Sequence, residues 1–460
     1  MTFAEAGADA EATLLHIFYA GNGLWRDCNL RDCHAENRDW GVDAATYTLY
    51  LRWKTTQDPI VATLTAALVS TTTEYPTGCR AVPCRFWSDI PEWDAIALMR
   101  EYEVLGGDKN ALARARAAFD YVDRASVFAL GACPNVHYQR ALGGGINLKT
   151  LETDGNATKA ALLLYNATHE RQYLKYAVAR YATVRRYFLD SVVPLYSVWL
   201  FDNGQRCDQV PHRFYASVNG DMIWNGLALA RATGNQRYRD EAIATGKAVD
   251  RYLSDGRGVF ADLQAENDIV EPLVESMYDL AIIQHQDFAR DWILRNAAAA
   301  LTDREPDGTF GRFFDGPPPK SKTVSVWQSN GGLALEIAAA ALAPNAVPQI
   351  DTWDNARFVP THIDTLPATI EFDGSAIAIV GTMGDECCEL GHARIYIDGV
   401  ETFDHTGIWQ NKSMSGAVPD SVLFAWRWPT SGHHTIAFEP GIPNAKEGGP
   451  FISLDGYYVK

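Results

Sequence analysis

Four aspartates stand where a glycine-rich or aromatic loop turns into a helix. Asp89 lies in "FWSDIPEWDAIALMREYEVLGGD", and Asp43, Asp154 and Asp221 hold similar places in their own segments. Carboxylates beside aromatic rings suit glycoside hydrolysis. One carboxylic acid protonates the leaving oxygen, and a second carboxylate attacks the anomeric carbon or activates water. If the four helix starts meet, they predict an acidic cleft that cleaves sugars.

Asp89 also has a simpler interpretation, as a helix cap. In that arrangement Pro91 falls in the first turn and Glu92 at the third helical position, as in a capping box with an acid in place of Ser or Thr. Such a cap contributes about 1 kcal/mol. The two roles are compatible, because a helix N-terminus favours an ionised carboxylate. We therefore expect Asp89 to be the nucleophile or base, and Asp221 or Asp154 to be a buried acid with a raised pKa.

Aromatic and polar residues near these carboxylates are candidates for binding the substrate. Tryptophan rings provide platforms for the apolar faces of sugars, although each ring has the alternative role of filling the core. The candidate platforms are Trp25, Trp40, Trp87, Trp93 and Trp224. The candidate polar contacts are Asp43, Glu92, Asp94, Asn156, Asn219 and Gln328.

Residues 10–343 show helical periodicity almost throughout, with apolar residues recurring three and four positions apart. Short polar turns near Asp58, Asp108, Glu170 and Asn235 repeat about every 50 to 65 residues, which predicts helical hairpins joined by long loops. Five or six hairpins fit this stretch. Periodicity alone also allows an open solenoid, but long loops rich in Gly and aromatics favour a closed (α/α)6 toroid, because such loops often carry active sites.

The sequence changes character near residue 345. We expect a helical catalytic domain over residues 1–345, a proline-containing linker over 346–362 and a β-sandwich over 363–460, where alternating segments such as "ATIEFDGSAIAIVGT" are separated by turn residues. Trp409, Trp426, Trp428, Tyr457 and Tyr458 in this last part suit a carbohydrate-binding module. The alternative is that these rings fill the sandwich core.

Composition and cysteine spacing limit the classes of partner and the cellular compartment that this protein can have. A net charge of −17 disfavours nucleic acid and anionic membrane surfaces as partners, and no apolar run is long enough to span a bilayer. Close cysteine pairs at 28/33 and 79/84, with a long-range pair at 133/207, predict disulfides and hence a secreted protein whose leader is absent from this chain. We expect a monomer. No P-loop, G-x-S-x-G or H-E-x-x-H motif occurs, so no cofactor or metal is expected.

Taken together, these segments resemble family 76 of the glycoside hydrolases, the endo-α-1,6-mannanases. "WSDIPEWDAIALMREYEVLGGDKN" is similar to the family's active-site segment "DDxxWxxLAxxRAYxLTGD", and "SVNGDMIWNGLALARATGNQRY" is similar to "YNQGxxIGALxxLYxxTGDxxY". "GGGINLKTLETDGNATKAALLLY" and "WQSNGGLALEIAAAAL" match two further family segments. The resemblance implies a six-hairpin toroid that cleaves α-1,6-mannan. A weaker resemblance relates the C-terminal part to galactose-binding-like modules.

One position departs from the family pattern. The family uses two adjacent aspartates as nucleophile and acid/base, and alignment on Trp93 places Asp89 at the first position but Ile90 at the second. A second carboxylate must then come from elsewhere, with Asp154, Asp221, Glu92 and Asp94 as candidates. The alternative is a non-catalytic glycan-binding protein on the same fold. A lyase or epimerase fits less well, because those reactions usually need His, Tyr or Arg in the cleft.

Overall fold

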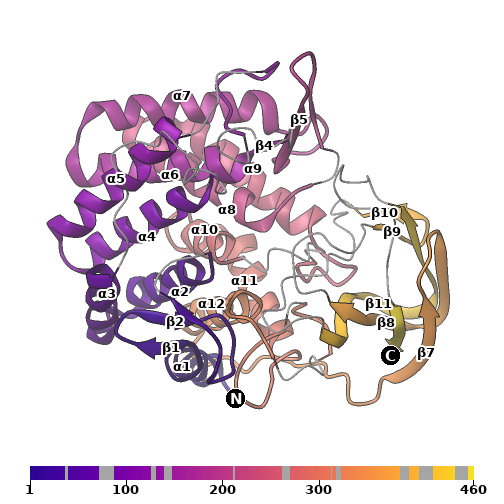
Figure 1. The fold of residues 1–460 in the computed structure, drawn as a ribbon. Coiled ribbons are helices and arrows are strands. Elements are labelled where there is room, and N and C mark those ends of the chain that lie inside the picture. The colour runs from indigo at the N-terminus through magenta and orange to yellow at the C-terminus, as the bar shows by residue number, and fades with distance from the viewer. Residues whose placement is uncertain are drawn as a thin grey trace.

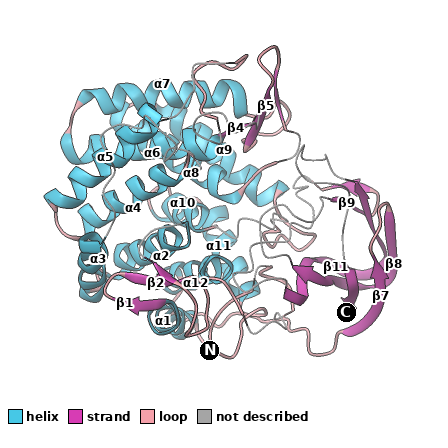
Figure 2. Ribbon diagram, viewed as in Figure 1, coloured by secondary structure: helices cyan, strands magenta, loops and turns pink. Residues whose placement is uncertain are grey.

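A computed structural model of the 460-residue chain describes residues 1–36, 40–71, 88–125, 131–138, 148–210, 213–261, 270–311, 313–317, 323–383, 393–402, 418–440 and 454–460. Helices fill the first three quarters of the chain, and strands dominate the last quarter (Figures 1 and 2). The predicted mainly-α architecture with a C-terminal β region is confirmed.

The described residues contain twelve α-helices and one π-helical turn, η1. Their bounds are α1 Phe3–Thr13, η1 Leu14–Phe18, α2 Trp40–Thr56, α3 Pro59–Thr71, α4 Ile90–Val104, α5 Lys109–Ala125, α6 Leu151–Thr168, α7 Arg171–Phe188, α8 Ala216–Thr233, α9 Gln236–Tyr252, α10 Glu271–Ile282, α11 Asp287–Ala300 and α12 Val326–Leu342.

The even-numbered helices form a closed inner ring. Each packs on the next, from α2 through α4, α6, α8 and α10 to α12, and α12 returns to α2. The odd-numbered helices lie outside, and α1 pairs with α12, so the first and last helices complete the sixth hairpin. This closure favours the toroid over the open solenoid. Short turns join the first five inner helices to the outer helices that follow them, and the start of α1 is hydrogen-bonded to the segment just after α12. All six inner helices therefore run the same way, and their N-termini lie at one end of the ring.

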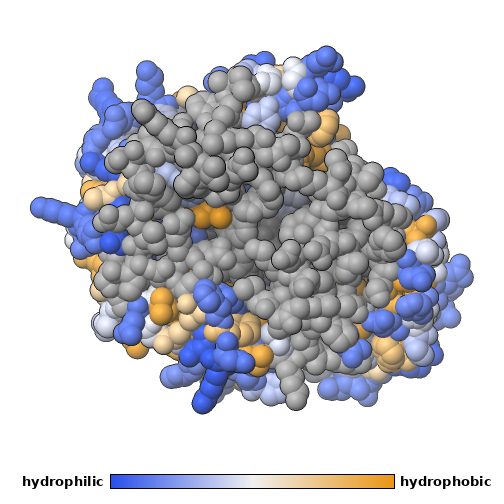
Figure 3. Space-filling view, viewed as in Figure 1, coloured by the Kyte–Doolittle hydropathy of each residue, from blue (hydrophilic) through white to orange (hydrophobic). Residues whose placement is uncertain are grey.

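Burial explains why the two rings have different sequences. In α6 and α8 nearly every residue of the first four turns is buried, including the polar ones. In the outer helix α7 buried residues recur every three to four positions, and charged side chains occupy the solvent face. Hydrophilic residues accordingly cover much of the described periphery (Figure 3). None of the described helices is long and apolar enough to span a bilayer.

Two small sheets lie on the loops that precede inner helices. Strands β1 to β3 form one antiparallel sheet before α2, and β4 to β6 form another around the start of α6 and before α8. Their bounds are β1 Tyr19–Gly21, β2 Leu24–Arg26, β3 Ala35–Glu36, β4 Leu148–Thr150, β5 Trp199–Asp202 and β6 Cys207–Gln209.

The C-terminal strands described form one six-stranded antiparallel sheet in the order β10-β9-β11-β8-β12-β7. Their bounds are β7 Arg357–Ile363, β8 Ala368–Met383, β9 Ala393–Ile397, β10 Val400–Glu401, β11 Val418–Pro440 and β12 Leu454–Val459. Strand β7 begins inside the segment expected to be a linker. Four of the five aromatic residues proposed for sugar binding pack against the buried core of this sheet, which agrees with the alternative that they fill the core: Trp426, Trp428, Tyr457 and Tyr458. The fifth, Trp409, lies outside the described residues.

Arg427 of β11 anchors the sheet to the helical domain. Its guanidinium is buried, lies 2.8 Å from both Asp315 Oδ1 and Asp351 Oδ2, and stacks 4.6 Å from the ring of Trp353. Its carbonyl accepts a hydrogen bond from the amide of Gly256. Burial raises the pKa of Asp315 to about 7. The two parts of the chain thus share a buried, charged interface.

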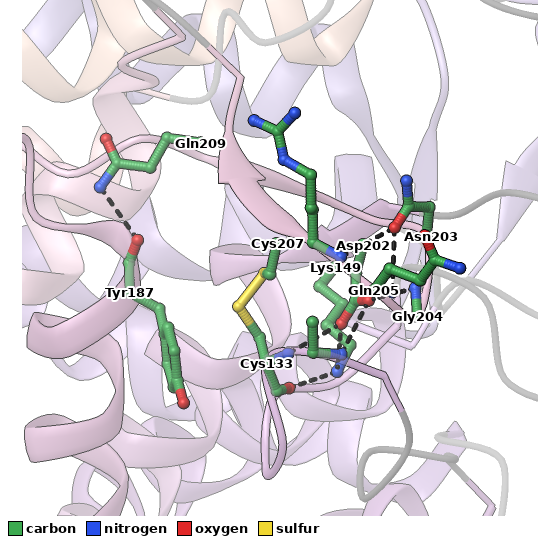
Figure 4. Close-up of a disulfide and its surroundings, with 11 residues drawn as sticks. Cys133, Lys149, Tyr187, Asp202, Asn203, Gly204, Gln205, Cys207 and Gln209 are labelled. Atoms are coloured by element: carbon green, nitrogen blue, oxygen red, sulfur yellow. Dashed lines mark hydrogen bonds and ion pairs between the residues drawn. A yellow bond between two sulfur atoms is a disulfide. The ribbon is translucent and has the colours of Figure 1, made fainter.

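All four cysteines in the described part form disulfides, Cys28–Cys33 and Cys133–Cys207, as the spacing predicts. The other four cysteines lie outside the described residues. Figure 4 shows that Cys133–Cys207 ties the loop before α6 to strand β6. Beside it the buried Lys149 pairs with Asp202, whose carboxylate accepts backbone N–H bonds from Ala132 and Cys133.

Replacing Cys133 and Cys207 with serine is expected to lower the free energy of unfolding by about 4 kcal/mol, because the bond closes a long loop in the unfolded chain. The same change at Cys28 and Cys33, which are five residues apart, should cost about half as much. Chemical denaturation of both double variants measures the difference. Equal losses would contradict the loop-length argument.

Candidate active site

The start of α4 presents Asp89 at the N-terminal end of the ring. Asp89 is the N-cap residue and is buried, and its carbonyl accepts hydrogen bonds from the amides of Glu92 and Trp93. Its side chain makes no capping hydrogen bond. The preceding Ser88 lies 2.6 Å from Thr153 Oγ1 of α6, which fixes two neighbouring helix starts to one another. The carboxylate of Asp89 therefore does not serve the helix amides, as a simple cap would.

Asp154 of α6 is held in a buried ion cluster. Its Oδ1 lies 2.8 Å from His137 Nδ1 and 2.9 Å from Arg180, and its Oδ2 accepts the backbone N–H of His137 at 3.0 Å. Burial alone would raise its pKa, but His137 and Arg180 lower it below its usual value. This arrangement keeps Asp154 ionised, and it joins the loop before α6 to the outer helix α7.

Asp221 of α8 lies in the interior of the ring, and the pKa of its carboxyl group is shifted in the opposite direction from that of Asp154. Its Oδ1 accepts a hydrogen bond from Lys159 of α6 at 2.9 Å, whereas its Oδ2 has no hydrogen-bond partner among the described residues. Burial raises the pKa of Asp221, although Lys159 and Arg100 oppose the shift. Of Asp154 and Asp221, Asp221 is therefore the one whose surroundings favour a protonated acid.

A close approach of α8 to α10 brings Asp221 toward Glu275. A Cβ atom on Gly220 would lie 2.4 Å from the amide nitrogen of Leu273, so only glycine fits there. Ser276 donates a hydrogen bond to the Gly220 carbonyl at 2.7 Å. One turn of α10 therefore packs directly against the turn of α8 that carries Asp221.

Glu275 is the centre of an ion network that sequence analysis missed. It accepts hydrogen bonds from Arg100 and Lys159, and Lys54 lies 3.6 Å from it. Burial would raise its pKa, but Arg100, Lys159 and Lys54 lower it well below the ordinary value. The signal in the sequence was a Lys or Glu inside an otherwise apolar helix, as in "KAALLLY" and "LVESMYDL". A charged side chain buried in such a helix is costly unless an opposite charge pairs with it.

The predicted tryptophan platforms take different positions. Trp93 packs edge-on against Tyr47 at 5.6 Å, and Trp25 packs against Tyr19 at 5.1 Å; both are buried. Trp224 lies under two cations, Arg100 and Lys159. Trp40 begins α2, but its side chain lies outside the described residues, as does the whole of Trp87.

The predicted polar contacts also separate into groups. Asp43 and Glu92 are buried in the first turns of α2 and α4, and Asp94 and Asn156 are buried in the second turns of α4 and α6.

Two others have structural partners. Asn219 bonds to both backbone groups of Tyr196 and to the Tyr215 carbonyl, and Gln328 forms a capping box with Ser325. In the described part, Cys133, Asp202 and Cys207 are grouped closely enough for a metal, but the two sulfurs are already bonded to each other.

Comparison with known proteins identifies the fold. The sequence matches no family model and no curated protein. Among solved structures, an α-1,6-mannanase of Salegentibacter sp. HEL1_6 aligns over 74% of this chain and all of its own, with a TM-score of 0.64 and 19% identity. That structure is an inactive variant with two adjacent aspartates replaced by alanine, in complex with α-1,6-mannotetrose.

Two other structures show how widely the fold occurs. The family 76 mannosidase Bt3792 of Bacteroides thetaiotaomicron aligns over 74% of this chain and 98% of its own, at 15% identity and a TM-score of 0.62. A cellobiose 2-epimerase of Bacillus thermoamylovorans aligns over 73% of this chain and 98% of its own, at 12% identity and a TM-score of 0.56. The helical part of this chain therefore has the six-hairpin fold found in the α-1,6-mannanases of glycoside hydrolase family 76.

Proposed function

We propose that this protein is a secreted glycoside hydrolase that cleaves α-linked mannose polymers, with α-1,6-mannan as the first substrate to test. The observation that carries the proposal is the set of buried carboxylates at or near the starts of four helices of the closed inner ring: Asp43, Asp89, Asp154 and Asp221. The same fold binds α-1,6-mannotetrose in the Salegentibacter enzyme. The two described disulfides support secretion.

Asp89 and Asp221 divide the chemistry in this proposal. Asp89 supplies the carboxylate that attacks the anomeric carbon or deprotonates water, since a helix N-terminus stabilises the ionised form. Asp221 supplies the acid, since burial raises its pKa. Asp154 is left with a supporting role, because His137 and Arg180 keep it ionised.

The isoleucine at position 90 is the reason for choosing Asp221. In the inactive Salegentibacter variant two adjacent aspartates are replaced by alanine. In this chain Asp89 is followed by Ile90, so an adjacent pair of aspartates is absent at this position. Hydrolysis here needs a second carboxylate from another helix, and Asp221 is a buried acid of the inner ring with an oxygen that no described group binds. The isoleucine equally supports a second candidate function, a monomeric glycan-binding protein without turnover.

The test is hydrolysis of a panel of glycans that includes α-1,6-mannan, with the products sized. We expect the wild type to release oligosaccharides and Asp89→Asn to lose at least about 10³-fold in kcat, because the reaction loses its nucleophile or base.

The matched control is Asp108→Asn. Asp108 does cap its helix, since its carboxylate accepts the Ala111 amide at 2.8 Å, and this variant should keep wild-type activity. Equal activity of Asp89→Asn and wild type would remove Asp89 from the mechanism. Binding of a glycan without any turnover would establish the second candidate instead.

A further inference from the structure

Lys159 connects two carboxylates from different helices in the interior of the ring. Its side chain is fully buried, and its Nζ lies 2.9 Å from Asp221 Oδ1 and 3.2 Å from Glu275 Oε2. Its ammonium also lies over the rings of Tyr47 and Trp224, at 4.6 and 5.2 Å from their centroids. A lysine so enclosed is costly unless its charge is paired, so its position is tightly determined.

The two carboxylates depend on Lys159 to different degrees. Glu275 has two further cations, since Arg100 donates a hydrogen bond to its Oε1 and Lys54 Nζ lies 3.6 Å away. For Asp221, Lys159 is the one cation in the described part of the chain that forms an ion pair with it. Removing Lys159 would therefore leave Glu275 paired, whereas Asp221 would lose its ion-pair partner in the described part of the chain.

We propose that Lys159 is a positioning residue for proton transfer by Asp221, an inference that rests on the proposed hydrolase function. By binding Oδ1, Lys159 fixes the carboxyl group and leaves Oδ2 as the oxygen that carries the proton. That proton passes to the glycosidic oxygen. The bond between the glycosidic oxygen and the anomeric carbon breaks at the same time, and its electron pair stays on the oxygen. The incoming nucleophile is an Asp89 oxygen, or a water that Asp89 deprotonates. The negative charge left on Asp221 then lies beside the Lys159 ammonium.

The charged and titratable groups around Asp221 come from four helices. They are Lys159 of α6, Glu275 of α10, Arg100 of α4 and Tyr47 of α2. Burial raises the pKa of Asp221, Lys159 and Arg100 lower it, and Glu275 raises it. Since an acid must be protonated to act, activity falls as the pH rises through this pKa. Loss of the Lys159 charge raises the pKa further and moves that loss of activity to higher pH.

The test compares the pH dependence of kcat/KM in wild type, Lys159→Met and Lys159→Arg. In Lys159→Met the alkaline limb should move up by about one pH unit or more, whereas Lys159→Arg, which keeps the charge, should stay near wild type. The matched control is Lys149→Met, because Lys149 is also fully buried and pairs with an aspartate, Asp202, at 3.2 Å. Its alkaline limb should not move. If the alkaline limb of the kcat/KM profile of Lys159→Met lies at the same pH as that of the wild type, the proposal is overturned.

A second readout needs no turnover. The infrared carboxyl band that disappears in Asp221→Asn reports the protonation of this residue directly, and it should titrate at higher pH in Lys159→Met than in wild type or Lys149→Met. Identical titration would overturn the role of Lys159. If no glycan is hydrolysed, the proposed function fails while this measurement still decides the inference. If Lys159→Met does not fold, Lys159→Gln, which is uncharged but polar, should give the same shift.

Discussion

Asp221→Asn should lower kcat on a natural polysaccharide by about 10²- to 10⁴-fold, because a general acid contributes that much when the leaving group is a poor one. The same variant should retain far more activity on a glycosyl fluoride, whose leaving group departs without a proton. Asp89→Asn, by contrast, should lose activity on both substrates, since the nucleophile or base is needed for either. The measurement is kcat for the two substrates in each variant.

Asp154→Asn is the informative comparison for this prediction. Asp154 is equally buried but is bound by His137 and Arg180. Its replacement should reduce stability and lower activity on both substrates by a similar factor. If Asp154→Asn instead keeps its activity on the glycosyl fluoride and Asp221→Asn does not, the acid has been assigned to the wrong helix.

Glu275→Gln should lower the free energy of unfolding by about 3 to 5 kcal/mol, the cost of breaking a buried ion pair while its partners stay buried. The partners are Arg100 and Lys159, which are themselves buried. Denaturation in guanidinium chloride measures this loss. A suitable control is Glu241→Gln. Glu241 also pairs with two arginines, Arg185 and Arg237, but the side chain of Arg237 is 72% exposed, so this change should cost less.

The loss in Glu275→Gln should also depend on pH. The folded protein lowers the pKa of Glu275 below the ordinary value, so the unfolded chain binds its proton more tightly. The stabilisation by Glu275 is therefore complete above the ordinary glutamate pKa of about 4.3 and declines as the pH falls below it. The stability difference between wild type and Glu275→Gln should shrink on acidification. A difference that is constant with pH would mean that the ionised form is not what stabilises the fold.

The hairpin architecture could be predicted because it leaves local signals in the sequence. Outer helices such as α7 alternate between buried and exposed positions, and short polar turns mark each return of the chain. Six hairpins can close into a ring, and closure places the N-termini of the inner helices at one end of it. The place of Asp89 at the N-cap of α4 was likewise readable, since Pro91 and Glu92 follow it as they do in helix starts.

The ion network of the interior could not be predicted in the same way. Lys159, Arg100 and Glu275 belong to three inner helices and meet only because the ring closes. Periodicity identifies which residues are buried, but the partner of a buried charge depends on how helices far apart in sequence are rotated against each other. The same limit applies to Asp154, because its pairing with His137 and Arg180, which favours the ionised form, could not be predicted from the sequence.

Arg427 has a consequence for how the two parts of this protein are inherited. Parts joined by a linker usually move independently, and such parts are exchanged between proteins as separate cassettes. Here the guanidinium of one part lies buried against Asp315 and Trp353, which flank the end of the other. A chain that ended before the sheet would leave Asp315, and a core tryptophan, open to water. The strand region thus shares a buried interface with the helical domain, and the two are expected to evolve as a single unit.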